Sequence, residues 1–224
     1  MPQDCDCFRS TKETNLRRNS NGSGFNTART SSKKYAHTWR VKMDADVLDV
    51  ADTVMSTFEQ LGVKCRIVGS VASSKLGMLR ATFDVDILAE LEQKHVNALK
   101  TRLAATFYLD EELILEAIEH RSSFNLIHLE TMLKVDVFIS KNRPYDQIRL
   151  GRAFQDDPRY ITAEDSVLGK LEWYRSGDET SERQWADVIG ILQVQAEKFD
   201  LEYARHWAKE IDVLDLLERA VSEA

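Results

Sequence analysis

Two aspartates alternate with apolar residues along the segment Phe83-Asp84-Val85-Asp86-Ile87. In a β-strand successive side chains point to opposite faces, so Asp84 and Asp86 share one face while their neighbours face the core. Aspartate is depleted in strands, and two carboxylates on one face repel each other. The segment Lys134-Val135-Asp136-Val137-Phe138 repeats the alternation with one carboxylate. This costly pattern predicts a chemical role for Asp84, Asp86 and Asp136.

Carboxylates that meet on one face of a sheet are stable if a cation lies between them. Mg²⁺ suits such a site because it takes hard oxygen ligands and completes its octahedron with phosphate oxygens and water. We therefore expect Asp84, Asp86 and Asp136 to hold divalent metal against the phosphates of a nucleotide. For Asp84 and Asp86 taken alone, an acidic sheet face exposed to solvent is the alternative.

A candidate phosphate site precedes the Asp-x-Asp strand. Gly69-Ser70 ends a predicted strand and opens a helix, where free backbone N–H groups and a hydroxyl can hold a phosphate. Glycine permits a close backbone approach, although turns also use Gly-Ser pairs frequently. Arg80 lies just before the strand and is a further candidate for neutralising a phosphate, with a solvated loop arginine as the alternative.

Hydrophobic periodicity predicts the elements that position these residues. Apolar residues at helical spacing follow Asp44, and Gly62 marks the end of that helix. Helices are further predicted over 71–78, 92–105 and 111–119, and strands over 63–68, 83–91, 124–129 and 133–139, the last two forming a hairpin. This order predicts an α/β (α+β) fold with helices packed on a sheet.

The region after 161 is predicted to be helical. Two capping boxes and two further polar residues before apolar stripes indicate four helix starts. The predicted N-caps are Thr162, Ser181, Asp200 and Asp212. Trp173, Trp185 and Trp207 lie among apolar helical positions and are predicted to be core residues rather than stacking platforms for bases.

Gly69, Ser70, Asp84, Asp86 and Asp136 together resemble the motifs of the polymerase-β-type nucleotidyltransferase superfamily, over about residues 44–140. The resemblance implies a mixed sheet with flanking helices, two Mg²⁺ ions and transfer of a nucleoside monophosphate from a nucleoside triphosphate. It also implies that Asp84 and Asp86 bind both metals, and that Asp136 completes the site and helps to deprotonate the attacking hydroxyl.

A second resemblance covers 161–192, whose Lys-Leu and Arg/Asp helical segments are similar to those of AbiEii/AbiGii-type toxin nucleotidyltransferases. It implies that Lys170 contacts the triphosphate and that Asp187 lies near the active centre. The long C-terminal region of those toxins is missing, and Trp185 replaces their small or charged residue. A surface lysine at Lys170, and a surface pair between Asp187 and Arg183, are the alternatives.

Composition limits the classes of function. The chain has 224 residues and a net charge of −7. Residues 1–43 carry nine Lys/Arg and three Asp/Glu, a net of +6, so the remainder carries 21 and 34, a net of −13. Such an acidic body has no bulk affinity for nucleic acid. Three cysteines make no disulfide framework, and neither a membrane span nor a secretory signal is present, so we expect a cytoplasmic protein without a membrane partner.

We predict three regions: a disordered basic tail over 1–35, a nucleotidyltransferase-like α/β core over 36–160, and a C-terminal helical region over 161–224. The leading hypothesis for function is a metal-dependent nucleotidyltransferase that acts on RNA or protein, toxin-like, with an antitoxin-like protein as a candidate partner. A non-catalytic module that binds a nucleotide or a partner protein is the alternative. Transfer of the terminal phosphate is a third hypothesis.

Overall fold

A computed structural model describes residues 47–77, 82 and 84–224, and the described residues belong to one compact unit. Arg80 and the predicted tail over 1–35 lie outside the described residues. The predicted division into a tail, a core and a helical region therefore stays a prediction.

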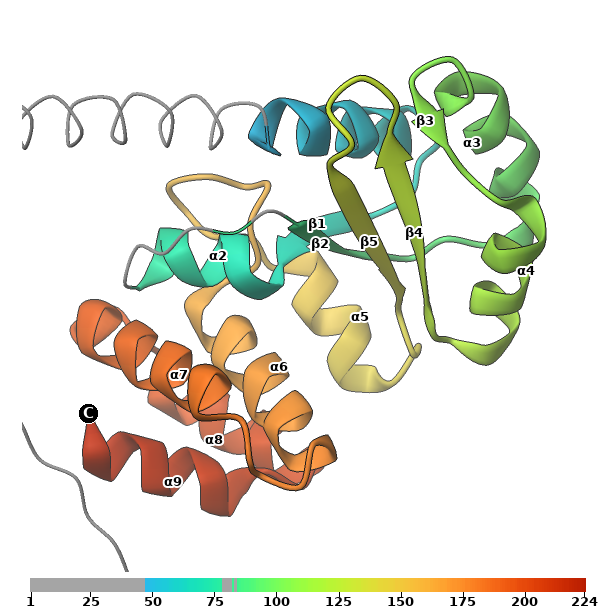
Figure 1. The fold of residues 1–224 in the computed structure, drawn as a ribbon. Coiled ribbons are helices and arrows are strands. Elements are labelled where there is room, and N and C mark those ends of the chain that lie inside the picture. Colours follow the sequence, from blue (N-terminus) through green and yellow to red (C-terminus); the bar gives the residue numbers. More distant parts are fainter. Residues whose placement is uncertain (1–46, 78–81, 83) are drawn as a thin grey trace, which may run out of the picture. The chain divides into compact units, whose positions relative to one another are not determined.

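Five strands of the described chain form a mixed sheet in the order β1-β2-β5-β4-β3 (Figure 1). β2 and β5 are parallel neighbours, and the other pairs are antiparallel. The predicted hairpin is confirmed as β4 and β5, whereas the short β3 was not predicted. The strand bounds are β1 Cys65–Val68, β2 Asp84–Ala89, β3 Phe107–Tyr108, β4 Ser123–His128 and β5 Lys134–Ile139.

Helices flank this sheet, which confirms the predicted fold class. Residues 47–60 are helical, and the predicted helices over 71–78, 92–105 and 111–119 are confirmed with small shifts of their ends. One helix was missed, although proline at its first position is a common helix start. The bounds are α2 Gly69–Leu76, η1 Gln93–His95, α3 Val96–Leu103, α4 Glu111–His120, α5 Pro144–Gly151, α6 Ala163–Ser176, α7 Glu182–Gln195, α8 Leu201–Glu210 and α9 Leu214–Glu223.

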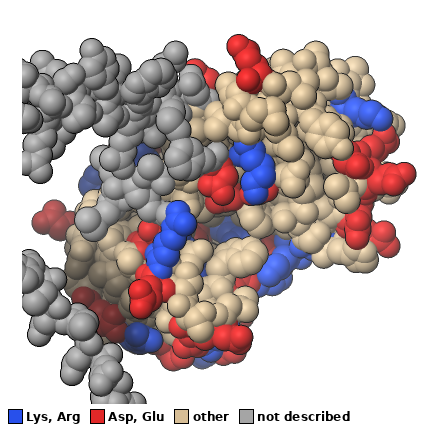
Figure 2. All heavy atoms as spheres, viewed as in Figure 1, with Lys and Arg blue, Asp and Glu red and all other residues tan. Residues whose placement is uncertain are grey.

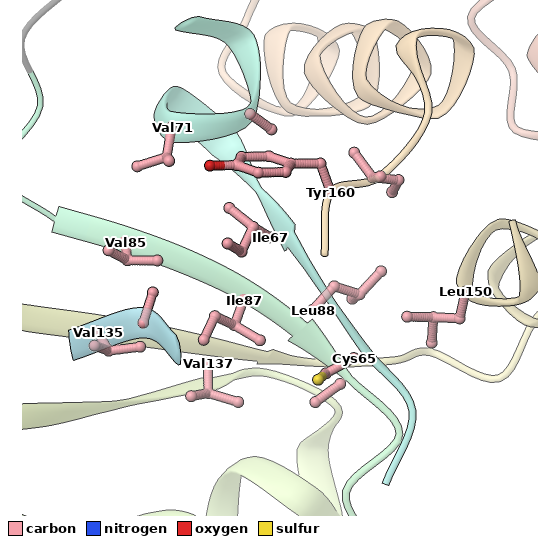
Figure 3. Close-up of a cluster of buried hydrophobic side chains, with 14 of the residues drawn as sticks. Cys65, Ile67, Val71, Val85, Ile87, Leu88, Val135, Val137, Leu150 and Tyr160 are labelled. Atoms are coloured by element: carbon pink, nitrogen blue, oxygen red, sulfur yellow. The ribbon is translucent and has the colours of Figure 1, made fainter. Parts of the chain in front are cut away.

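Alternate residues of the central strands make the core of the sheet (Figure 3). Ile67, Val85, Ile87, Val135 and Val137 are each at most 2% exposed. A shift of one residue in strand pairing would turn the intervening aspartates into this core, so the apolar set fixes the register. The aspartates of β2 and β5 consequently project from the opposite face.

Backbone pairing at the edge of the sheet brings α6 close to β1. The N–H of Ile67 donates to the carbonyl of Arg159 at 2.8 Å, and the N–H of Ile161 donates to the carbonyl of Ile67 at 3.1 Å. Thr162 then caps α6 by accepting from the N–H of Asp165. Residues far apart in sequence are thereby placed on two sides of one space.

Three of the four predicted N-caps are confirmed, namely Thr162, Ser181 and Asp200. The prediction for Asp212 is wrong, because the N-cap of α9 is Val213. Asp212 instead adopts a left-handed backbone conformation with φ of 60°, in the turn that follows α8. A short polar residue tolerates this conformation, so its preference for turns decides its place.

The C-terminal helices α6 and α7 pack against α2, and α6 to α9 pack against each other (Figure 1). The side-chain amide of Gln195 on α7 donates to the carbonyl of Leu76 at 2.8 Å. A Cβ added at Gly77 would lie 3.0 Å from the backbone nitrogen of Ile191, so α7 approaches the end of α2 closely. None of the described helices is long and apolar enough to cross a membrane.

Candidate active site

Asp86 and Asp136 lie directly opposite each other on the parallel strands β2 and β5. Asp84 lies opposite Lys134 in the same register, on the same face. Neighbouring strands are about 4.8 Å apart, so the backbone atoms that carry the paired side chains are held at about that spacing. The sheet therefore gathers the three predicted carboxylates and one lysine.

The electrostatics of Asp86 reflect this crowding. Burial, together with the negative charges of Asp84 and Asp136, raises the pKa of Asp86 from 3.8 to about 6. A hydrogen bond from the backbone of Ser70 and the positive charge of Lys170 lower the pKa, but by less. The ionised form of Asp86 is thus costly until a further cation reaches it.

Lys134 partly neutralises the cluster. Its Nζ lies 2.7 Å from Oδ2 of Asp136, and this contact raises the pKa of the lysine. In this arrangement, the described residues contain no group of three His, Cys, Asp or Glu side chains spaced to hold a metal ion. The carboxylates have the right chemistry and register for a divalent cation. To bind this cation, Asp136 would have to give up its contact with Lys134.

Gly69 and Ser70 form the first turn of α2 next to Asp86. Gly69 has a φ of +63°, in the left-handed region that favours glycine. A Cβ added there would lie 2.6 Å from Cγ of Asp86. Only glycine therefore permits the end of β1 and the start of α2 to approach the carboxylate this closely. A helix start beside acidic ligands favours phosphate binding through a bridging cation.

A cavity of about 480 Å³ is lined by residues of the sheet and of α6. Four predicted site residues line it: Gly69, Ser70, Asp86 and Lys170. Asp84 and Asp136 flank Asp86, and Asp187 contacts Lys170. Acidic and basic side chains lie next to one another on the face in view in Figure 2. A volume of this size is within the range of sites for small ligands.

Lys170 is a buried residue of the cavity wall. It is 5% exposed, and its Nζ donates to Asp187 at 2.8 Å and to Gln184 at 3.1 Å. The alternative of a surface lysine is therefore wrong. A buried lysine needs a partner for its charge, and Asp187 supplies one from α7. The pair links α6 to α7 and holds the ammonium near Asp86.

Trp173 does not belong to the core. It is 61% exposed and lines the cavity, so the prediction that it is buried is wrong. Its ring meets that of Phe138 edge to face, with centroids 5.8 Å apart. Trp185 and Trp207 do pack against the core as predicted. Trp173 shares their helical spacing, but its side of α6 faces the cavity.

Five charged residues of the cavity wall were missed by sequence reasoning. They lie in different parts of the chain, with two of them on α6, and they carry no motif: Arg121, Lys141, Arg149, Asp165 and Glu172. The sequence offers a signal only for the two residues on α6. Polar residues at helical spacing around Lys170 form a polar stripe on a helix that is largely buried.

No family model and no curated protein matches the chain. Among solved structures, an antigenic nucleotidyltransferase-like protein from Paracoccidioides brasiliensis is similar, with a TM-score of 0.44, 16% identity and coverage of 79% of this chain and 93% of that one. The antibiotic-resistance factor ANT(2'')-Ia is similar with a TM-score of 0.47, 10% identity and the same coverages of 79% and 93%.

A lincosamide antibiotic adenylyltransferase, LnuA, is similar with a TM-score of 0.39 and 16% identity, over 63% of this chain and 93% of that one. The similar structures are thus nucleotidyltransferases and nucleotidyltransferase-like proteins.

Proposed function

We propose that the protein is a metal-dependent nucleotidyltransferase that moves a nucleoside monophosphate from a nucleoside triphosphate to a hydroxyl of RNA or protein. The observation that carries the proposal is the register of β2 and β5, which sets Asp86 opposite Asp136. Asp86 lines a cavity together with the Gly69-Ser70 turn and Lys170, and Asp136 flanks it on β5.

The donor set fits a divalent metal. Asp84, Asp86 and Asp136 supply hard oxygen ligands, and burial and the charges of its two neighbours raise the pKa of Asp86, a cost that a bound cation would offset. Asp84 and Asp86 would hold two Mg²⁺ ions, and Asp136 would complete the site once Lys134 moves away. Bound metal would supply charge stabilisation for the attacking and leaving oxygens.

The remaining residues position the triphosphate. The backbone N–H groups at Gly69-Ser70 would hold phosphate oxygens, while Lys170 on α6, which lines the same cavity, would balance their charge. Asp187 would orient that ammonium through the contact of 2.8 Å. In this reaction class most of the rate enhancement comes from positioning and charge stabilisation.

The transfer step is a displacement at the α-phosphorus. The acceptor oxygen forms a bond to this phosphorus, the bond to the β-phosphate oxygen breaks, and pyrophosphate leaves. Asp136 would accept the proton of the attacking hydroxyl. A compact transferase of this kind suits a toxin-like role, in which an antitoxin-like protein neutralises the enzyme.

Label transfer tests the proposal. The protein is incubated with Mg²⁺, total RNA or lysate, and each triphosphate labelled at either the α- or the γ-phosphate. We expect label only from the α-position, and we expect the double variant Asp84→Ala/Asp86→Ala to lose it. Glu119→Gln, an exposed acid of α4 outside the cavity, is the matched control and should retain activity.

The other outcomes separate the alternatives. Transfer from the γ-position would identify a phosphotransferase. Tight nucleotide binding without any transfer would identify a non-catalytic module. Full activity in the double variant would contradict the assignment of the carboxylates.

A further inference from the structure

Trp173 is an exposed aromatic side chain held in a fixed place. With 61% of the residue exposed, its ring is open to a ligand, while the contact with Phe138 orients it. Leaving a tryptophan exposed forgoes hydrophobic stabilisation that burial would give. The position on α6, beside buried Lys170, therefore points to a binding role rather than to packing.

Two basic residues accompany this ring along the cavity. Arg121 donates to the carbonyl of Ser140 at 3.3 Å, and it has a left-handed backbone conformation at the end of α4. Lys141 is half-exposed, and its Nζ lies 3.5 Å from Glu172. That carboxylate already pairs with Arg143 at 2.6 Å. An exposed pair as long as that of Lys141 is worth little, so its charge is available to an anion.

The distance between the carboxylates and Phe138 suits one nucleotide. Phe138 follows Asp136 by two positions on β5, which corresponds to about 7 Å along a strand. Gly69-Ser70 lies on the β1 side of Asp86, and Phe138 lies on the β5 side. A donor with its phosphates at Gly69-Ser70 thus leaves the side of Trp173 to a second group.

We propose that Trp173, together with Phe138, Arg121 and Lys141, is the acceptor site, and that it binds the unpaired end of a single-stranded RNA. This inference rests on the proposed function and selects RNA over protein as the acceptor. An aromatic face stacks an unpaired base irrespective of its sequence, and flanking cations neutralise the phosphates on either side. A duplex end, whose bases are already stacked and paired, offers no free base to the ring.

The overall charge sets the length of RNA that can bind. The chain after residue 43 has a net charge of −13, because it carries 21 Lys/Arg and 34 Asp/Glu. On the acceptor side, we therefore expect phosphate to be attracted over a short stretch around Arg121 and Lys141. For about two neutralised phosphates, the logarithm of affinity falls with the logarithm of salt concentration with a slope of about 1.4.

Fluorescence anisotropy tests the site without catalysis. The probe is a ten-nucleotide single-stranded RNA of mixed sequence, labelled at its 5′ end, in EDTA. We expect Trp173→Ala to weaken binding by about 5- to 100-fold, and Trp173→Phe to restore most of it. Lys141→Ala should lower the salt slope by about 0.7. The control variants Leu113→Ala, exposed on α4, and Lys94→Ala, exposed in η1, should bind like the wild type.

Several outcomes would overturn the acceptor site. These are equal RNA affinity for Trp173→Ala and the wild type, equal affinity of the wild type for the duplex form of the probe, and transfer of label to protein alone. A raised KM for the triphosphate in Trp173→Ala, with unchanged RNA affinity, would assign the ring to the donor base instead. The double variant Asp84→Ala/Asp86→Ala should still bind RNA, so the test of RNA binding is separate from the test of transfer. Binding of RNA without any transfer of label would contradict only the proposed function.

Discussion

The carboxylate of Asp86 occupies the space that a side chain at Gly69 would need. A Cβ at that position would lie 2.6 Å from Cγ of Asp86 and 2.8 Å from its Cβ. The close approach joins the candidate phosphate turn to the candidate metal ligand. A substitution at Gly69 should therefore disturb both the fold and the site.

Gly69→Ala should lower the free energy of unfolding by about 2 to 5 kcal/mol, because the left-handed backbone and the clash both add cost. Gly62→Ala is a matched control, since Gly62 has a φ of +71° and nothing within 4 Å of an added Cβ. Gly62→Ala should lower the free energy of unfolding only by the cost of the left-handed backbone, about 1 to 2 kcal/mol. Urea unfolding of both variants measures the difference, and equal losses would show that Asp86 does not crowd Gly69.

Asp86→Asn should stabilise the metal-free protein at neutral pH. The pKa of Asp86 is about 6 in the folded chain against an ordinary value of 3.8, so the folded state binds the proton more tightly. The stability of the wild type consequently falls as pH rises from about 4 to 6, and the full cost is present above that window. The gain in the variant should reach up to about 3 kcal/mol at pH 7.5.

The measurement is the free energy of unfolding in EDTA across pH 4 to 8. The gap between the variant and the wild type should close as the pH falls through this window. Asp49→Asn, an exposed aspartate of the helix over 47–60, serves as the control. A difference in the free energy of unfolding that stays constant with pH would show that the pKa of Asp86 is not raised in the folded protein.

Lys170→Ala should cost about 3 to 5 kcal/mol, because it leaves the charge of Asp187 without its buried partner. The double variant Lys170→Met/Asp187→Leu should recover most of this stability, since apolar residues of similar size replace the pair. Both variants should bind the triphosphate weakly in calorimetric titrations. Tight binding by the stable double variant would remove Lys170 from the phosphate site.

Lys134→Ala should strengthen divalent metal binding by up to about fivefold, the worth of an exposed pair. The ammonium of Lys134 lies 2.7 Å from Asp136 and competes for that carboxylate. Lys64→Ala is the control, because Lys64 pairs with Glu90 just beyond the ends of β1 and β2, outside the cavity. Mg²⁺ titrations followed by calorimetry compare the two, and weaker binding in Lys134→Ala would refute competition.

Alternation along strands made much of the site predictable. The apolar residues around Asp84, Asp86 and Asp136 fixed the face of each side chain, and the Gly-Ser turn marked the start of α2. The pairing of β2 with β5 depends on contacts between distant segments. No local pattern encodes the partner of a strand, so the register of Asp86 with Asp136 required the structure.

The environments of α6 residues were harder to predict. Lys170 and Trp173 lie three positions apart on one helix, yet the lysine is buried and the tryptophan is exposed. Burial depends on what packs against each side of α6, and α7 covers Lys170 through Asp187 and Gln184. Residue type alone gives the opposite expectation for both.

Binding of Mn²⁺, followed by the EPR signal of the free ion in the presence of a non-hydrolysable triphosphate, tests the shared carboxylate site most directly. We expect Asp84→Ala, Asp86→Ala and Asp136→Ala each to weaken binding by at least about tenfold, because loss of a ligand should cost at least as much as loss of an outer partner. Glu119→Gln should bind like the wild type. Wild-type affinity in Asp136→Ala would contradict the account, since β5 would then contribute nothing to the site.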